Sequence, residues 1–244
     1  MFAFPTATDV VEFAQKGSNC MTAGLRSYVR SQMSCGMRAA KEQFRAEWRL
    51  FRLHRREAKK ASQFLHSLPI KLNLGCGPNR KGGWVNIDLF DPKADLRLDL
   101  REPWPFPDNS ASYIYSEHVF EHFEFHVEVP HFLGEAFRVL KPGGIFDVIV
   151  PDTGPALKAY GDPHSAYWST AAKRWHPDWC ETALDHINYH FRQDGEHQYA
   201  WDAESLGRTL RAAGFSDVSR REFDPLRDTE ERRVGSLYML GTKP

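Results

Sequence analysis

Residues 71–79 read Lys-Leu-Asn-Leu-Gly-Cys-Gly-Pro-Asn, a short apolar run that breaks into Gly-x-Gly. Glycine has no Cβ, so such a turn can be tight and lets a ligand approach the backbone closely. The next apolar run ends in an acid, Asp88, thirteen residues after Gly75. In open α/β sheets, ligands bind beyond the carboxyl ends of the strands, where these residues are expected. An acid there can accept hydrogen bonds from both hydroxyls of a ribose, so the pattern predicts a nucleoside-bearing cofactor.

Two kinds of cofactor fit a Gly-x-Gly turn. A dinucleotide fingerprint has a third glycine and an acid about 20 residues further on, but the third position here is Arg80. A pyrophosphate binds at a helix N-terminus, and residues 78–83 leave little room for a helix. The sequence therefore favours a cofactor without a pyrophosphate. A nicotinamide oxidoreductase and a non-catalytic nucleoside-binding protein remain the alternatives from other functional classes.

The rest of the chain alternates predicted strands and helices. Strands are expected at 84–88, 96–100, 113–116 and 145–150, with a rigid proline-rich loop at 103–110. A helix is expected over 117–140, interrupted near Pro130 and ended by Lys141-Pro142-Gly143-Gly144. Alternating elements with short connections predict a mainly parallel sheet covered by helices.

These segments carry motifs that resemble those of class I S-adenosylmethionine-dependent methyltransferases, in the methyltransferase type 11-like branch. The motifs are Leu-Gly-Cys-Gly at 74–77, Phe-Pro-Asp-Asn-Ser at 106–110, Glu-His at 121–122 and Leu-Lys-Pro-Gly-Gly at 140–144. The resemblance covers residues 69–244. It implies a Rossmann-like α/β domain with a seven-stranded, mainly parallel sheet, helices on both faces and a C-terminal antiparallel hairpin, which segments 218–223 and 236–241 fit.

The resemblance also implies which residues hold S-adenosyl-L-methionine. Gly75 and Gly77 would pass under its methionine and ribose, Asp88 would hold the ribose hydroxyls, and Asp99 would accept from the adenine amino group. For both acids, a solvated position at a strand end is the alternative. The whole expected cofactor set is Asn73, Gly75, Cys76, Gly77, Asp88, Leu89, Asp99, Leu100, Ser116 and Glu117.

A histidine-rich stretch, His118-Val119-Phe120-Glu121-His122, follows the strand at 113–116. The sulfonium cofactor supplies an activated methyl group, but an alcohol acceptor must lose a proton, and histidine suits that task near neutral pH. We therefore predict His118, Glu121 and His122 as catalytic residues, with His118 as the general base. Alternatively, Glu121 and His122 only brace a helix.

The same stretch raises the question of a metal. It spells an inverted zincin motif, and the ubiquinone-pathway O-methyltransferases that it resembles bind a divalent ion through acid-x-x-Glu-His. Position 118 is His118 here rather than an acid. Because Mg²⁺ prefers oxygen ligands, the sequence predicts no metal, with a site at His118, Glu121 and His122 as the alternative.

The segment 152–199 is too long for a plain connection and is rich in aromatic residues and histidines. In the family that the chain resembles, this segment commonly forms a cap over the acceptor pocket. We expect substrate contacts from His186, Asn188, His197 and Tyr199. A small satellite core with solvated histidines is the alternative.

Residues 1–68 are predicted to form a basic helical extension. They carry twelve Lys and Arg against five Asp and Glu, a net charge of +7, whereas the remaining chain carries −7. Phe44, Trp48 and Phe51 share one helical edge, which either packs on the domain or lies on an anionic membrane surface. No RNA-reading motif is visible, so no nucleic-acid partner is expected.

The sequence thus predicts an S-adenosylmethionine-dependent methyltransferase that O-methylates a hydroxyl of a small molecule, a sugar or a lipid-linked glycan. An Asn/Asp-Pro-Pro-Tyr motif, typical of amino-group methyltransferases of nucleic acids, is absent after the strand at 113–116, and the resembling branch is often associated with envelope-glycan assembly. N-methylation of a small amine is the alternative. Four scattered cysteines show no metal or disulfide spacing, which favours the cytoplasm, with peripheral contact at the inner membrane face. We expect neither a membrane span nor a secretory signal, and oligomeric state is not predicted.

Overall fold

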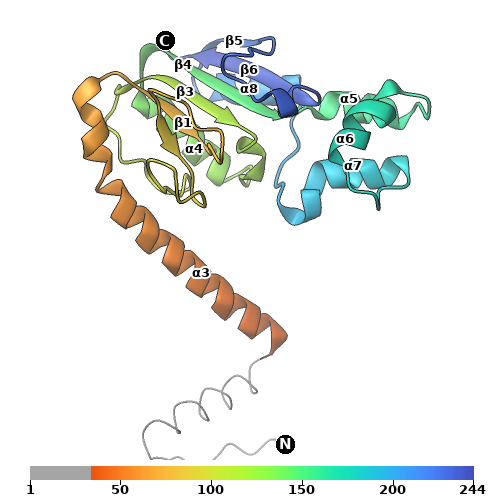
Figure 1. The fold of residues 1–244 in the computed structure, drawn as a ribbon, viewed down its shortest axis with the longest axis horizontal. Helices are drawn as coiled ribbons and strands as arrows, with labels where there is room; N and C mark the ends of the chain where they lie inside the picture. Colours follow the sequence, from red (N-terminus) through yellow and green to blue (C-terminus); the bar gives the residue numbers. More distant parts are fainter. Residues whose placement is uncertain (1–33) are drawn as a thin grey trace, which may run out of the picture. The chain divides into compact units, whose positions relative to one another are not determined.

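The computed structural model describes residues 34–244, which include the helix α3 (Cys35–Ala58) and the domain that follows it (Figure 1). The chain divides into two compact units, Met1–Arg52 and Leu53–Pro244. His54, Glu57 and Ala61 are buried and belong to the second unit. The division therefore falls inside α3 rather than after residue 68, and the predicted extension over residues 1–33 lies outside the described residues.

A six-stranded mixed sheet forms the centre of the second unit. Its strands are β1 (Ile70–Leu74), β2 (Val85–Ile87), β3 (Ala111–Glu117), β4 (Leu140–Pro151), β5 (Ser216–Arg220) and β6 (Ser236–Thr242), in the order β2-β1-β3-β4-β6-β5. The first four pair in parallel, and β6 is antiparallel to both β4 and β5. The mainly parallel α/β sheet and its C-terminal antiparallel hairpin are confirmed.

The strand expected at 96–100 is not formed, which is why the described residues hold six strands and not seven. Leu96 makes only an isolated bridge to Ile87. No regular strand forms here because the side chain of Asp95, rather than a backbone carbonyl, accepts a hydrogen bond from β2. Its Oδ2 accepts from the Asn86 backbone N–H at 2.7 Å and so satisfies a donor on the free edge of β2.

One face of the sheet packs on α4 (Glu128–Val139) and α8 (Ala203–Ala212). Alternate strand residues such as Ile114, Phe146 and Val148 meet Phe132 of α4 and Leu210 of α8 in one hydrophobic core. The helix expected over 117–140 is shorter than predicted, because β3 runs to Glu117 and the short 3₁₀ helix η2 (Phe120–His122) intervenes. Pro130 does not interrupt α4. It lies in the first turn, where its missing N–H costs nothing.

Loops cover the opposite face, so the expectation of helices on both faces is wrong for the described residues. The core there is small, with buried Tyr115, Ile149 and Tyr238. The turn after β1 passes directly into β2 without a helix. In its place the segment 221–234, which carries the 3₁₀ helix η5 (Glu230–Arg232), covers this face.

A buried ion-pair network holds the segment 221–234 in place. Arg221 donates from Nε to Asp147 Oδ1 at 2.8 Å and from Nη1 to Asp228 Oδ2 at 2.6 Å. Tyr113 donates to Asp147 at 2.7 Å and Tyr115 donates to Asp228 at 3.0 Å. Asp147 is fully buried, and burial raises the pKa of its carboxyl while Arg221 opposes that shift. Arg221 thus bonds to two buried carboxylates, and Arg227 lies 4.0 Å from Asp147 as a second cation.

The short 3₁₀ helix η1 (Ala61–Ser67) precedes β1, and the remaining helices form a segment between β4 and α8 that we call the cap. They are α5 (Thr153–Tyr160), the π-helical turn η3 (Trp168–Ala172), α6 (Lys173–Trp175), α7 (Ala183–Arg192) and the 3₁₀ turn η4 (Gln193–Gly195). Figure 1 shows α5, α6 and α7 gathered beside the end of β4. Asp152 and Trp201 form a parallel bridge, and Thr153 donates its N–H to the Trp201 carbonyl. The two ends of the cap therefore lie side by side at the end of β4, near the expected limits of 152 and 199.

We expect Arg221→Ala to lower the free energy of unfolding by about 3–5 kcal/mol, because it leaves two buried carboxylates without their cation. Chemical denaturation of the full chain measures the change. Arg208→Ala is the matched control, since Arg208 is exposed on α8, and it should change stability by less than about 0.5 kcal/mol. Equal effects of the two substitutions would contradict a stabilising role for the network.

Candidate active site

The turn that follows β1 has the geometry expected of a cofactor turn. Gly75 and Gly77 have φ angles of 62° and 46°, in the region that favours glycine. A Cβ on Gly75 would overlap the side chain of Val119, so the turn lies directly against the histidine-rich stretch. Cys76 donates its N–H to the Ile87 carbonyl at 3.0 Å, and burial raises the pKa of its thiol to about 12. The Cys76 thiol is therefore neutral and packs in the turn.

Asp88 lies at the end of β2 beside this turn. Its Oδ2 accepts from the Gly77 N–H at 2.9 Å, and its Oδ1 accepts from the N–H groups of Phe90 and Asp91. Asn73 braces the same turn by donating to the Asn79 carbonyl and to Asn86. The carboxylate is half-buried, and each oxygen still has acceptor capacity for a ribose hydroxyl.

Asp99 is placed differently from the prediction. It is buried, and Arg101 donates to it from its backbone N–H and from both Nε and Nη2, the last at 2.7 Å. Desolvation raises the pKa of the Asp99 carboxyl, but the bonds from Arg101 outweigh it and hold the pKa below its ordinary value. An adenine amino group would share this carboxylate with Arg101. Leu100 is a core residue, and Leu89 is half-buried with its carbonyl accepting from Arg97.

Ser116 and Glu117 end β3 one strand away from the glycine turn. Both are buried, and the Ser116 hydroxyl has no hydrogen-bond partner. Glu117 accepts from the Thr229 hydroxyl at 2.6 Å and from the Thr229 N–H at 3.1 Å. Its backbone carbonyl accepts from Arg232. The segment 221–234 therefore closes over the end of β3.

His118 follows Glu117 in a backbone conformation that is unusual for histidine, with a φ angle of 55°. Its Nε2 lies 2.8 Å from the Ser236 hydroxyl, which donates its own proton to the Arg232 carbonyl at 2.6 Å. Since that hydroxyl is already a donor, Nε2 carries the imidazole proton and Nδ1 keeps its lone pair. Burial lowers the pKa of His118 to about 3, so the ring is neutral.

Glu121 lies beside His118 and is the least satisfied acid of the site. It is buried, and neither carboxyl oxygen has a hydrogen-bond partner. Its Oε1 lies 3.8 Å from Nδ1 of His118. Burial raises the pKa of Glu121 to about 8. A carboxyl with that pKa changes its charge near neutral pH, which suits proton transfer.

The C-terminal end of the cap contacts Glu121 and His122. The Glu121 carbonyl accepts from the N–H groups of Gln198 and Tyr199, and the rings of His122 and His197 lie 5.2 Å apart. The predicted substrate residues His197 and Tyr199 therefore do lie beside the predicted catalytic residues. Ligand atoms of Glu121, His122 and His197 lie within 4.8 Å of one another, an arrangement that could hold a metal ion. His197, rather than His118, is the third member of that group, and the expectation of no metal stays a prediction.

The other two predicted substrate residues lie elsewhere in the cap. His186 on α7 has its Nδ1 2.9 Å from Nδ1 of His176. Asn188 is exposed and donates to the Leu184 carbonyl within its own helix. The structure gives neither residue a contact with His118, Glu121 or His122.

Sequence reasoning missed Thr229, Arg232 and His190. The first two reach Glu117 from a segment that lies more than a hundred positions later in the chain. His190 accepts from His197 Nδ1 through its carbonyl, and its ring is 6.2 Å from that of His176. The repeated histidines of the cap are the one sequence signal for these contacts between histidines.

These residues fit an S-adenosylmethionine-type group by their own geometry. The positive φ angles open the backbone at Gly75 and Gly77, Asp88 stands at the next strand end, and the Ser116 hydroxyl and the Glu121 carboxyl are buried without partners.

Comparison with known proteins agrees with this geometry. A family model for a methyltransferase domain matches residues 49–220. A S-adenosylmethionine-dependent methyltransferase of Archaeoglobus fulgidus is 15% identical, with 84% of this chain and 98% of that chain covered and a TM-score of 0.44. Phosphoethanolamine N-methyltransferase 2 of Haemonchus contortus is 12% identical, with 78% and 52% covered and a TM-score of 0.44. Human N-acetylserotonin methyltransferase is 15% identical, with 72% and 48% covered and a TM-score of 0.42.

None of the curated proteins compared with the chain matches it. The family model spans most of the chain, including the glycine turn, the histidine-rich stretch and the cap. The chain belongs to the methyltransferase-domain family and is an S-adenosylmethionine-dependent methyltransferase.

Proposed function

We propose that this methyltransferase acts on a hydroxyl group of a small molecule, a sugar or a lipid-linked glycan. The observation that carries the proposal is the pair of His118 and Glu121. The imidazole presents an unprotonated Nδ1, and the carboxyl beside it is buried without a hydrogen-bond partner. A hydroxyl acceptor needs such a proton acceptor, whereas an amine that binds unprotonated needs none.

Each residue then has a separate task. When bound, S-adenosylmethionine supplies an activated methyl group on its sulfonium. Gly75, Gly77 and Asp88 hold the donor at the ends of β1 and β2. His118 takes the proton of the acceptor hydroxyl on Nδ1. Because burial alone makes this ring a weak base, the ionised carboxylate of Glu121, 3.8 Å away, is needed to stabilise the imidazolium. His122, His197 and Tyr199 would orient the acceptor from the cap side.

The side chains around this site support the proposed acceptor class. Tyr199 stacks on Phe125 with ring centroids 4.3 Å apart, and the imidazole rings of His122 and His197 lie 5.2 Å from each other. Aromatic faces beside polar nitrogens suit a ring with hydroxyl groups, such as a sugar or a phenol. Methylation of a small amine remains the second candidate, and a protein that binds the nucleoside without catalysis is the third. A transfer assay with labelled donor and fractionated cell extract identifies the acceptor, and mass spectrometry of the product locates the methyl group.

We expect His118→Asn to lower the methyl-transfer rate about 10²–10⁴-fold while leaving binding of S-adenosylhomocysteine within about twofold. Asparagine tolerates a positive φ angle, so the variant removes the base and keeps the backbone. His126→Asn is the matched control, since His126 is exposed, and it should retain wild-type rates. Full turnover by His118→Asn would favour the amine acceptor over the hydroxyl.

The rate should also depend on pH through Glu121. The raised pKa of about 8 means that the carboxyl is neutral below that pH and ionised above it. If ionised Glu121 supports the imidazolium, the rate rises with pH up to about 8 and then levels. Glu121→Gln should lower the rate and abolish this rise, and a pH–rate profile that is the same for variant and wild type would refute the role.

We expect Asp88→Asn to weaken binding of S-adenosylhomocysteine at least about tenfold, because it removes a charged acceptor for the ribose hydroxyls. Calorimetry on the full chain measures this, with NAD as the competing ligand that should not bind. Asp108→Asn is the control, since Asp108 is exposed on the far end of the sheet and pairs with Arg138. Binding of NAD in preference to the demethylated donor would overturn the assignment.

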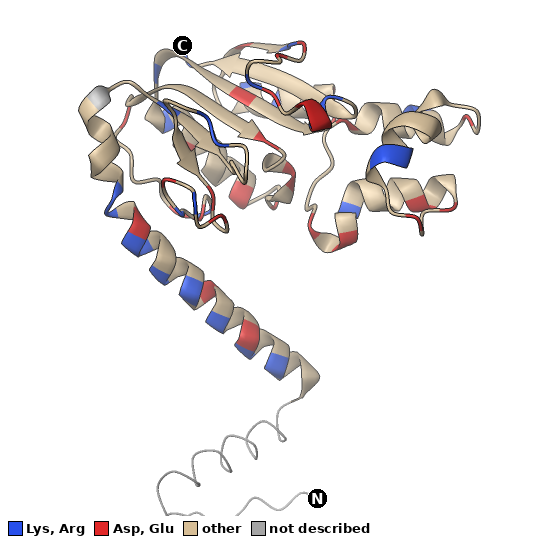
Figure 2. Ribbon diagram, in the orientation of Figure 1, with Lys and Arg blue, Asp and Glu red and all other residues tan. Residues whose placement is uncertain are grey.

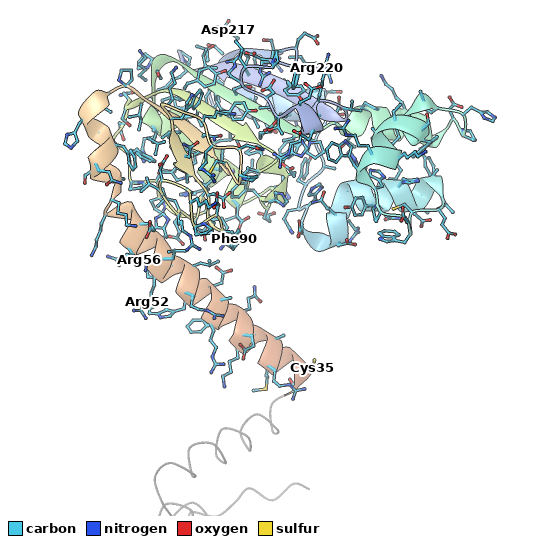
Figure 3. The ribbon with its side chains drawn as sticks, viewed as in Figure 1. Cys35, Arg52, Arg56, Phe90, Asp217 and Arg220 are labelled. Atoms are coloured by element: carbon cyan, nitrogen blue, oxygen red, sulfur yellow. The ribbon has the colours of Figure 1, made fainter. Side chains whose placement is uncertain are left out.

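We further propose that α3 makes peripheral contact with an anionic membrane surface, at the inner face of the cytoplasmic membrane. Within residues 34–244, no helix has both the length and the apolar character needed to cross a membrane. Figure 2 shows Lys and Arg repeated along α3, and Arg52 and Arg56 project from it in Figure 3. Phe44 and Trp48 are one turn apart and exposed at 68% and 52%. A basic helix with exposed aromatics suits such a surface.

Vesicle flotation tests this contact. The full chain should float with vesicles that contain anionic phosphatidylglycerol and remain below with phosphatidylcholine alone, because each basic residue near the surface adds about 1 kcal/mol. The double variant Phe44→Ser/Trp48→Ser should lose most of the bound fraction. Phe90→Ser removes an equally exposed aromatic from the second unit (Figure 3) and should bind like wild type. Flotation that is insensitive to lipid charge, or to the double substitution, would refute the contact.

A further inference from the structure

We propose that the cap holds a zinc ion through His176, Cys180 and His186. Among the described residues, these three bring two imidazole nitrogens and one sulfur within 4.8 Å of one another. The pair of imidazoles is the closest contact, with Nδ1 to Nδ1 at 2.9 Å. The site lies in the cap and shares no ligand with the pair of His118 and Glu121.

Local structure explains why the three side chains converge. His176 follows α6, and the chain then turns so that Cys180 donates its N–H to the Pro177 carbonyl. Thr182 caps α7, and its capping box with Asp185 fixes the first turn of that helix. His186 is on the second turn and faces back toward His176. All three ligands therefore come from one short segment, so little chain entropy opposes their meeting.

The donor set fits zinc better than any hard cation. Zn²⁺ binds thiolate sulfur at about 2.3 Å and imidazole nitrogen at about 2.0–2.1 Å in tetrahedral geometry. Those bond lengths place ligand atoms roughly 3.3–3.7 Å apart, so the present spacing needs only small side-chain movements. Three protein ligands leave the fourth position for a water molecule. Binding displaces the proton of the Cys180 thiol to solvent and uses the neutral nitrogens of both histidines.

A second observation points to a metal, because the cap has no aliphatic core and its aromatic rings gather around the two histidine ligands themselves. Between Thr153 and Gln198 no large apolar side chain joins either core cluster, and the buried apolar residues are only Ala156, Ala159, Ala171, Ala172 and Cys180. Several of its large side chains are exposed instead: Leu157, Tyr160, Trp175, Trp179 and Leu184. Small modules without a sufficient core are usually held by disulfides or metals. The cap has a single cysteine, so it cannot form a disulfide within itself.

No sequence motif predicts this site. The cysteines are scattered, and His176-x₃-Cys180-x₅-His186 matches no standard zinc spacing. His186 was expected to bind the acceptor, but its contact with His176 makes it a ligand candidate. The inference does not rest on the proposed acceptor, because it concerns residues that hold the cap together.

Cobalt substitution of the full chain tests the proposal. Protein purified with zinc should contain about one equivalent of tightly held metal, and Co²⁺ should give a thiolate-to-metal charge-transfer band that depends on Cys180. We expect Cys180→Ser to abolish the band and His186→Ala to weaken metal affinity at least tenfold. Chelation should make cleavage of the cap by protease at least several-fold faster, while the sheet stays folded by circular dichroism.

Matched controls separate this site from the rest of the molecule. Cys35→Ser removes an exposed cysteine, and His164→Ala removes an exposed histidine of the cap; both should bind like wild type. His197→Ala breaks the group with Glu121 and His122 and should leave the charge-transfer band unchanged. No zinc in the wild-type chain, or a cobalt band that survives Cys180→Ser, would overturn the proposal.

Discussion

The hydrogen bond from the Gly77 N–H to Asp88 Oδ2 joins the ends of β1 and β2, and the site depends on that join. It requires a left-handed backbone at Gly77, which a residue with a Cβ would strain. A Cβ on the preceding Gly75 would overlap Val119, so this glycine lets the turn pack directly against the histidine-rich stretch. Gly75 thus allows two segments that follow different strands, β1 and β3, to meet.

On the face of the sheet opposite α4 and α8, the segment 221–234 replaces the helices that were expected. The turn after β1 is too short to form one, and the segment 221–234 takes the vacant place. Its contacts are polar, with Arg221 between the carboxylates of Asp147 and Asp228. A polar network of this kind specifies one position for the segment, because any shift would leave a buried charge unpaired. That position in turn brings Thr229 and Arg232 onto Glu117 at the end of β3.

Histidines link the active site with the cap. His122 contacts His197, His197 donates from Nδ1 to the His190 carbonyl, and the His190 and His176 rings are 6.2 Å apart. Burial lowers the pKa of His176 and of His190 to about 4, so both rings are neutral. Neutral imidazoles keep a nitrogen lone pair that can bind a metal ion or accept a proton.

Much of the site could be predicted from the sequence because its determinants are local. A glycine turn, an acid after an apolar run and a histidine-rich stretch can each be recognised in the sequence. The structure gives Gly75 a positive φ angle, places Asp88 at the end of β2 and places His118 directly after β3, while the roles of these residues stay predictions. Three features depend on tertiary contacts that the sequence does not reveal. They are the absence of a strand at 96–100, the face of the sheet that loops cover, and the convergence of His176, Cys180 and His186. Each feature involves residues that are not neighbours in the chain. Asp95 accepts from the Asn86 N–H of β2, Arg221 pairs with Asp147, and Trp201 bridges to Asp152 where the cap ends. The sequence alone therefore determined the glycine turn and the types of side chain that follow the strands beside it. Only the packing of the tertiary structure decided which acids and histidines contact one another.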